Sequence, residues 1–258
     1  MLARQRQELI LEQVRASGGA RVSDLVESLG VSDMTVRRDI EALARRGLVA
    51  RVHGGATSVA VPSTQEPSFA LKSSLRTAQK AAIGRAAAAL VERGTSVAVS
   101  GGTTTYAVAR ELSSLANLTV VTNSLPVAEL LHRERPGLPV VLTGGERTPS
   151  DALVGPVAVA ALRTLHVDWL FLGVHGMDAR AGFTAPDLLE AETDRALIAS
   201  ARRVVVTADS SKWGLVGLSS IARLDDVDVL VTDDNLDAEA TSTVRSRLGR
   251  LVLAPTRV

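Results

Sequence analysis

The chain of 258 residues contains no cysteine, which excludes disulfide and thiolate chemistry and fits a reducing compartment. It also lacks an apolar run of membrane-spanning length. Residues 1–14 are charged and helically periodic, which is not the pattern of a secretory signal peptide. With 46% hydrophobic residues, the chain can bury the cores of a small domain and a larger one. We therefore expect a cytoplasmic globular protein with no membrane partner.

Aromatic residues make up only 2% of the chain, which leaves little surface for stacking on bases or bare sugar rings. We therefore expect a ligand to be recognised through phosphate and hydroxyl groups. The histidines His53, His132, His166 and His175 are scattered, so no metal site is expected. No GxxxxGK, GxGxxG, HExxH or GxSxG motif is present, and we expect neither a cofactor nor a catalytic residue.

The net charge is close to neutral, with 29 basic and 28 acidic residues and a formal charge of +1. By itself this balance does not indicate a nucleic-acid partner. The first 56 residues carry nine arginines, no lysine and seven acidic residues, so the asymmetry along the chain is slight. A prediction of DNA binding must therefore rest on geometry.

Residues 22–55 have the pattern of a helix-turn-helix with a wing. Gly30 separates two helices, because glycine reaches positive φ at low cost and ends the first one. Ser32 is placed to cap the second helix, with Asp33 in its first turn. The apolar residues expected to face the core are Val22, Leu25, Val26 and Leu29 on the first helix, Val36, Ile40 and Leu43 on the second, and Leu9, Ile10 and Val14 on a preceding helix that ends near residues 17–19.

The second helix then turns a polar and basic face outward. In a helix-turn-helix this helix enters the major groove, where an arginine fork matches guanine O6 and N7. Residues 48–55 alternate and end in paired glycines, which predicts a hairpin wing near phosphates or the minor groove. A small helical domain with a solvated basic face is the alternative. The predicted DNA contacts are Ser32, Thr35, Arg37, Arg38, Arg45, Arg51 and His53.

The chain divides into a winged helix-turn-helix domain at residues 1–56, a proline-containing linker at 57–75 and a larger domain at 76–258. In the larger domain, apolar strands alternate with amphipathic helices, which predicts an α/β fold with a mostly parallel sheet covered on both faces. The predicted strands are 97–99, 118–121, 140–142, 169–174, 204–206 and 229–231. The predicted helices are 77–91, 106–115, 126–132, 157–165, 189–200 and 238–248.

Small polar or glycine-rich residues follow each predicted strand. Since the carboxyl ends of parallel strands share one edge, where ligands bind, we expect these loops to converge. Residues 101–105, GGTTT, lie between a strand and a helix, so backbone N–H groups, hydroxyls and a helix dipole can meet an anion there. A phosphate is the natural occupant, although strand-to-helix turns also need glycine for geometry alone.

Lys212 ends the loop TADSSK and is one of only three lysines in a chain with 26 arginines. A chain that uses arginine so consistently indicates a specific need for a compact ammonium at this position. Such a group would serve as a point charge for a phosphate or sugar oxygen. An ordinary surface lysine is the alternative.

These residues together resemble the DeoR family of transcriptional regulators over nearly the whole chain. The resemblance is carried by VSDLVESLGVSDMTVRRDIEALARRGLVARVHGGA, GGTTT, TNS, TGG, GFTAPDLLEAETDRALI and ADSSKWG. It implies a sensor domain related in fold to ribose-5-phosphate isomerase, which binds a phosphorylated sugar and thereby alters affinity for operator DNA. The implied effector contacts are Gly102, Thr103, Thr104, Thr105, Asn123, Ser124, Glu190 and Lys212. Ser100 departs from the family, many members of which have an acidic residue there.

We expect a repressor of a carbohydrate catabolic operon. One alternative is a sugar-phosphate isomerase with an appended DNA-binding domain, but the acidic DGADE-like loop of those enzymes is GVHGMDA here, which leaves only Asp178. Another is an activator, or a sensor of an unphosphorylated metabolite. Because symmetric half-sites require a symmetric protein, we expect a homodimer or homotetramer on double-stranded operator DNA.

Overall fold

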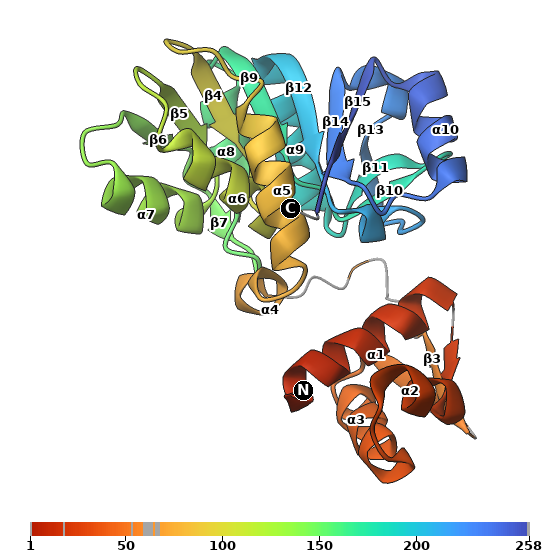
Figure 1. The fold of residues 1–258 in the computed structure, drawn as a ribbon. Coiled ribbons are helices and arrows are strands. Elements are labelled where there is room, and N and C mark those ends of the chain that lie inside the picture. The colour runs from red at the N-terminus through yellow and green to blue at the C-terminus, as the bar shows by residue number, and fades with distance from the viewer. Residues whose placement is uncertain (1, 18, 53, 59–63, 65–67, 257–258) are drawn as a thin grey trace. The chain divides into compact units, whose positions relative to one another are not determined.

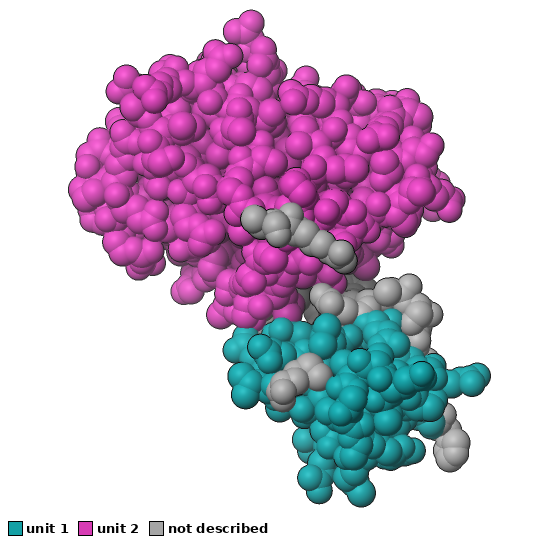
Figure 2. Space-filling view, in the orientation of Figure 1, with its two compact units in different colours: residues 1–62 teal, residues 63–258 magenta. Residues whose placement is uncertain are grey.

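The computed structural model describes residues 2–17, 19–52, 54–58, 64 and 68–256. The chain forms two compact units, residues 1–62 and residues 63–258 (Figure 2). Each unit has its own hydrophobic core.

The first unit is a winged helix-turn-helix (Figure 1). Its elements are α1 (Ala3–Ser17), β1 (Gly19–Arg21), α2 (Val22–Leu29), α3 (Asp33–Arg45), β2 (Val49–Val52) and β3 (Gly55–Ser58). Gly30 ends α2 with a φ of 64°, and Ser32 caps α3, as the sequence predicts. The two helices and the turn between them are therefore confirmed.

The wing contains a strand that the sequence did not predict. Its sheet has the order β1-β3-β2, with antiparallel pairing throughout. β1 is only three residues long and shows no alternation, so no periodic signal marks it. A Cβ at Gly55 would lie 2.2 Å from the carbonyl oxygen of Ala20, so glycine is required where β1 and β3 approach each other.

The core of the first unit joins all three helices. Ile10 and Val14 of α1 are buried against the helix-turn-helix as predicted, whereas Leu9 is 43% exposed, because it lies on the opposite side of α1. The buried Asp39 of α3 accepts hydrogen bonds from Arg6 Nε at 2.5 Å and Gln7 Nε2 at 2.9 Å. This charged contact fixes α1 on the face of α3 opposite to its exposed arginines.

The second unit is built on a seven-stranded parallel sheet in the order β15-β14-β12-β9-β4-β5-β6. Its strands are β4 (Ser96–Val99), β5 (Thr119–Thr122), β6 (Val140–Leu142), β9 (Val167–Leu172), β12 (Ala201–Thr207), β14 (Val229–Asp233) and β15 (Arg250–Ala254). The six predicted strands are all present. The seventh, β15, was missed although four of its five residues are apolar; it is a short edge strand whose residues are mostly half-buried.

Helices cover both faces of this sheet (Figure 1). One face packs against α5 (Thr77–Ala88), α6 (Thr103–Leu112) and α7 (Leu125–Glu134). The other packs against α8 (Pro156–Leu162), α9 (Leu188–Ser200) and α10 (Ala238–Arg247). Consecutive residues of β9 alternate between the two cores, with Phe171 on the first face and Leu170 and Leu172 on the second. The predicted α/β architecture is thus confirmed.

The second unit also contains short elements outside the seven-stranded sheet that the sequence did not predict. A three-stranded antiparallel sheet has the order β10-β11-β13, and a hairpin pairs β7 with β8. A five-residue helix, α4, and two 3-10 turns, η1 and η2, complete the unit. Their bounds are α4 (Phe69–Ser73), β7 (Glu146–Arg147), β8 (Leu153–Val154), β10 (Gly176–Asp178), β11 (Gly182–Ala185), η1 (Ser210–Lys212), β13 (Ser219–Ala222) and η2 (Leu224–Asp226). In the part of the chain that the structure describes, no helix combines the length and apolarity required to cross a bilayer.

Candidate DNA-binding and effector sites

The N-terminus of α3 brings two of the predicted DNA contacts together. Ser32 Oγ accepts a hydrogen bond from the backbone N–H of Thr35 at 3.3 Å and lies 2.9 Å from Thr35 Oγ1. Ser32 is exposed and Thr35 is half-buried. The two hydroxyls therefore form one polar pair at the end of the helix that enters the major groove in this class of motif.

The two arginines that follow differ in their contacts. Arg37 donates to Asp33, one turn earlier, with Nε–Oδ1 at 2.5 Å and Nη2–Oδ2 at 3.2 Å. Both side chains of this pair are about half exposed, at 49% and 59%. Arg38 is exposed and makes no side-chain hydrogen bond or ion pair with any residue that the structure describes. Of these two arginines, only Arg38 therefore has a guanidinium with no contact among the described residues.

The remaining predicted DNA contacts extend along the same unit. Arg45 is exposed in the last turn of α3, and Arg51 is exposed on β2, where it pairs across the wing with Ala56. His53 lies outside the described residues. Exposed arginines thus occur on both α3 and the wing, as a helix-turn-helix that contacts a duplex requires.

In the second unit, the loops after β4, β5 and β9 meet at the carboxyl edge of the sheet. Asn123 Oδ1 accepts a hydrogen bond from the N–H of Gly101 at 2.8 Å, and Ser100 Oγ accepts one from the N–H of Gly173 at 2.9 Å. Ser100 is 1% exposed. The convergence expected from the sequence is therefore present, and Ser100 has a defined place in it as the link between two loops.

The GGTTT loop begins helix α6. Gly102 is the N-cap, with a φ of 143°, and no side chain caps the helix. Thr105 is fully buried, and its hydroxyl donates to the carbonyl of Gly102 at 3.0 Å. Thr104 is buried and Thr103 is half-buried. Because the first N–H groups of a helix have no partner within it, this terminus suits an anion.

Asn123 and Ser124 are almost fully buried, and their side chains bind backbone groups. Asn123 Nδ2 donates to the carbonyl of Leu153 at 3.1 Å, and Ser124 Oγ accepts from the N–H of Val127 at 3.4 Å as the N-cap of α7. These contacts shape the loop edge. A direct contact with an effector stays a prediction for both residues.

Two further predicted residues lie on other elements. Glu190 is half-buried in the first turn of α9, where its N–H donates to the N-cap carboxylate of Asp187 at 3.1 Å. Lys212 is half-buried at the end of η1, and its N–H donates to the carbonyl of Asp209 at 3.0 Å. Lys212 acts electrostatically on His175, which follows β9, so the turn after β12 belongs to the same loop edge.

Positive charge gathers beside Lys212. Burial, followed by the nearby ammonium groups of Lys212 and Lys72, lowers the pKa of His175 to about 4. Burial also lowers the pKa of Lys80 to about 8; Asp209 opposes this shift, and Lys212, Lys72 and Arg76 add to it. The three lysines of the chain therefore lie within electrostatic range of one position. The scarcity of lysine in the sequence singles out Lys212, but no sequence pattern places Lys72 or Lys80 at the site.

Asp178, the acidic residue of the loop GVHGMDA, has a structural role. Its Oδ1 accepts hydrogen bonds from the N–H groups of Arg180 and Ala181, both at 2.8 Å. These bonds lower the pKa of Asp178, as expected for a carboxylate that fixes a turn. No group of three or more residues able to hold a metal ion occurs among the residues described here.

Comparisons with known proteins agree with this architecture. Residues 6–61 match the family model of the DeoR-like helix-turn-helix domain, and residues 75–234 match that of the DeoR C terminal sensor domain. The two domains define a DNA-binding transcriptional regulator that carries a sensor domain. The chain belongs to the DeoR family.

The relatives are similar over almost their whole length. A putative aga operon transcriptional repressor of Escherichia coli O157:H7 is 34% identical, over 93% of this chain and 90% of its own. The transcriptional regulator GlpR of Haloferax volcanii is 36% identical, over 95% and 96%. The glycerol-3-phosphate regulon repressor of Haemophilus influenzae is 34% identical, over 89% of both chains. These relatives are named as regulators, not as enzymes.

Among solved structures, ribose 5-phosphate isomerase A of Methanocaldococcus jannaschii is similar over 52% of this chain and 53% of its own, with a TM-score of 0.39 and 18% identity. A similarity of this size supports no conclusion about activity.

Proposed function

We propose that the protein is a cytoplasmic repressor of a carbohydrate catabolic operon and that a phosphorylated sugar changes its affinity for operator DNA. The observation that carries this proposal is the electropositive loop edge of the second unit. There the uncapped N-terminus of α6 and a group of ammonium side chains, including Lys212, offer donors and charge to a phosphoryl group.

On the DNA side, the exposed face of α3 reads base edges while the wing contacts the backbone. We assign these contacts to Ser32, Thr35, Arg37, Arg38, Arg45, Arg51 and His53. On the effector side, the neutral imidazole of His175 and the hydroxyl of Thr103 suit sugar hydroxyls. We assign the effector contacts to Gly102, Thr103, Thr104, Thr105, Asn123, Ser124, Glu190 and Lys212, of which Thr105, Asn123 and Ser124 act mainly by shaping the loops.

The relatives support the class of effector. One is named as a repressor of a glycerol-3-phosphate regulon and another as a repressor of an aga operon. We extend to this chain the control of a catabolic operon by a phosphorylated carbohydrate, acting on a homodimer or homotetramer. Such an effector typically changes operator affinity by about 5- to 150-fold.

The test is a band-shift titration of the full chain on the DNA upstream of its own gene and of the neighbouring genes. A sugar kinase or transporter gene among the neighbours would select the sugars to test. Each phosphorylated sugar is compared with its unphosphorylated form at constant ionic strength. We expect specific binding that only a phosphorylated form releases. Release by the unphosphorylated sugar alone, or no specific binding to any of these DNAs, would contradict the proposal.

A further inference from the structure

The three lysines of the chain converge although they are far apart in sequence. Lys72 lies in α4, Lys80 in α5 and Lys212 in η1. Lys72 and Lys212 both act electrostatically on Lys80 and on His175. Like charges within electrostatic range repel one another; the carboxylate of Asp209 offsets part of this repulsion at Lys80, and a bound anion would offset more of it. The cluster is therefore best explained as a binding site that extends beyond Lys212.

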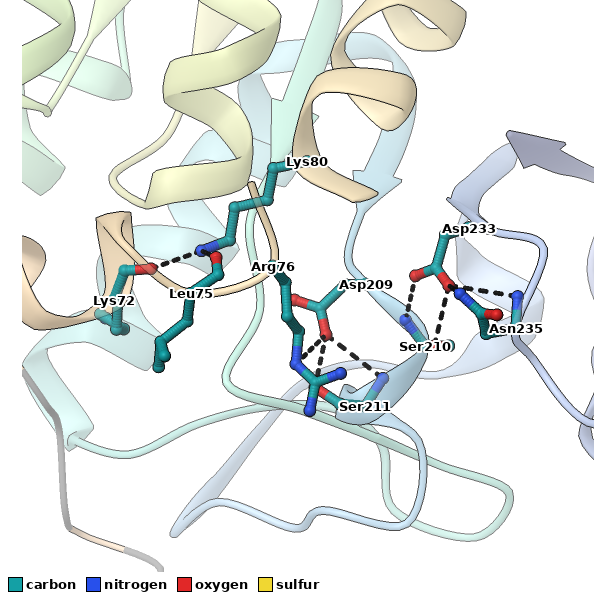
Figure 3. Close-up of polar contacts among 9 residues, drawn as sticks. All are labelled: Lys72, Leu75, Arg76, Lys80, Asp209, Ser210, Ser211, Asp233 and Asn235. Atoms are coloured by element: carbon teal, nitrogen blue, oxygen red, sulfur yellow. Dashed lines mark hydrogen bonds and ion pairs between the residues drawn. The ribbon is translucent and has the colours of Figure 1, made fainter. Parts of the chain in front are cut away.

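Lys80 holds the segment that carries Lys72. Its buried ammonium donates to the carbonyl of Lys72 at 2.5 Å and to that of Leu75 at 2.7 Å (Figure 3). Two of its three N–H donors therefore bind the backbone of α4 and of the turn that follows it. Lys80 thus positions this segment, whereas the side chain of Lys72 is half-buried at the surface.

The same segment is tied to the turn that carries Lys212. Arg76 Nε lies 3.5 Å from Asp209 Oδ1, and Asp209 is the N-cap of η1 (Figure 3). Asp209 also accepts a hydrogen bond from the N–H of Ser211 at 3.2 Å. Ser210, between them, is anchored by Asp233, to which its N–H donates at 2.7 Å. Both cation-bearing segments are consequently fixed by contacts of neighbouring residues, Lys80 and Arg76 on one segment and Asp209 and Asp233 at the other.

At its other end, the segment borders the GGTTT loop. The ring of Phe69 packs edge-on against that of Tyr106 in α6, with centroids 5.5 Å apart. The N–H of Phe69 also donates to the carbonyl of Pro149 at 3.4 Å. Residues 69–76 therefore contact both α6 and the η1 turn, the two elements to which the phosphoryl group is assigned.

We propose that Lys72 binds the phosphoryl group together with Lys212, so that a bound effector bridges α4 and the η1 turn. This inference rests on the proposed function and extends it, because Lys72 lies outside the matched sensor-domain residues 75–234. In chain order α4 is the first described helix after the DNA-binding unit, so an effector held by Lys72 acts on a helix that follows directly on the connection between the two units. Binding of the effector thereby adds a contact between α4, at the end of this connection, and the η1 turn.

The experiment is calorimetric titration of the full chain with inorganic phosphate and with glycerol 3-phosphate, using sulfate as the competing anion. We compare the unmodified chain with Lys72→Gln, Lys212→Gln and the double variant. Lys72→Arg restores the charge. Arg85→Gln, an exposed cation of α5 on the same unit, is the matched control. Thermal unfolding of each variant reports whether the fold is retained.

We expect Lys72→Gln and Lys212→Gln each to weaken binding of the phosphate compounds by about ten- to a hundredfold, the range for a charged hydrogen bond. Lys72→Arg should recover most of the affinity, and Arg85→Gln should not change it. If Lys212→Gln loses binding while Lys72→Gln binds normally, the role of Lys72 is overturned and the proposed function stands. If the unmodified chain binds neither compound nor any phosphorylated sugar, the proposed function fails as well.

Discussion

The carboxylate of Asp33 accepts two hydrogen bonds from the guanidinium of Arg37, one turn further along α3. The adjacent Arg38 has no such contact among the described residues. An arginine recognises guanine through a bidentate pair of hydrogen bonds, and the guanidinium of Arg37 already makes such a pair with Asp33. To pair with a base, the guanidinium of Arg37 would first have to leave Asp33, whereas that of Arg38 has no such contact to break.

Replacing either arginine should weaken specific binding. We expect Arg37→Ala and Arg38→Ala each to cost about 1–3 kcal/mol of operator affinity if each pairs with guanine, with the fold intact because both side chains are exposed. Operator titrations at fixed salt measure the effect. Unchanged operator affinity in both folded variants would refute the assignment.

Replacing Asp33 should have the opposite effect on DNA binding. Asp33→Ala releases the Arg37 fork and removes a negative charge near the phosphates, so operator affinity should rise, while helix stability falls by about 0.5–1 kcal/mol. Glu41→Gln is the control, since it removes an exposed acidic residue of α3 outside this pair. An equal rise in both variants would attribute the effect to net charge and not to the pairing.

The operator itself should be repeated. If two identical units read two half-sites, footprinting should reveal inverted or otherwise repeated elements about 10 base pairs apart, or a multiple of that spacing. Sedimentation of the complex would give the number of chains bound. Protection of a single unrepeated half-site by one chain would contradict the expected symmetry.

Lys212→Ala should remove the response to the effector. Because Lys212 lies in η1 and not in the helix-turn-helix, operator affinity without effector should stay near that of the unmodified chain. A band-shift titration of both proteins against the same sugar phosphates checks this. Equal release of both by the same compound would show that Lys212 has only a structural role.

The pKa of His175 should show whether the proposed effector site is occupied by a phosphate. Its folded pKa of about 4 lies below the ordinary 6.5, so the unfolded chain binds more protons between these values. This contribution to stability is present above pH 6.5 and is lost as the pH falls towards 4. Charges beside it come from Lys212 and Lys72, so a bound phosphate should raise the pKa of His175. Titration of its imidazole by NMR, assigned with His175→Gln, measures the pKa without phosphate and with it. A pKa near 6.5 without phosphate would refute the argument that burial lowers it.

Much of the fold could be predicted from periodicity. Val36 and Ile40 repeat at helical spacing, and six parallel strands alternate with helices, so both signals extend over many residues. β1, β10 and the β7–β8 hairpin span two or three residues each, and a pattern of that length cannot be distinguished from a loop. These elements form only because the sheets and loops around them supply partners.

The candidate site was predictable only in part. The scarcity of lysine singled out Lys212, but Lys72 lies in a stretch assigned to the linker at 57–75. In the structure, Ser58 still belongs to β3, and Phe69–Ser73 form α4. A five-residue helix has no amphipathic repeat, and the contact between Arg76 and Asp209 joins residues 133 positions apart. Long-range contacts of this kind depend on the tertiary fold, which local sequence patterns do not encode.

Because the lysines of this chain are confined to one region, reagents that acylate primary amines will act on it as site-directed probes. Apart from the α-amino group, the primary amines of the chain belong to Lys72, Lys80 and Lys212. Attaching the protein to a sensor surface through its amines would therefore modify the proposed effector site itself, so attachment through an affinity tag is preferable. Lys80, buried and held by two carbonyls, should react last, and the order of acylation would report on the integrity of the segment that it holds.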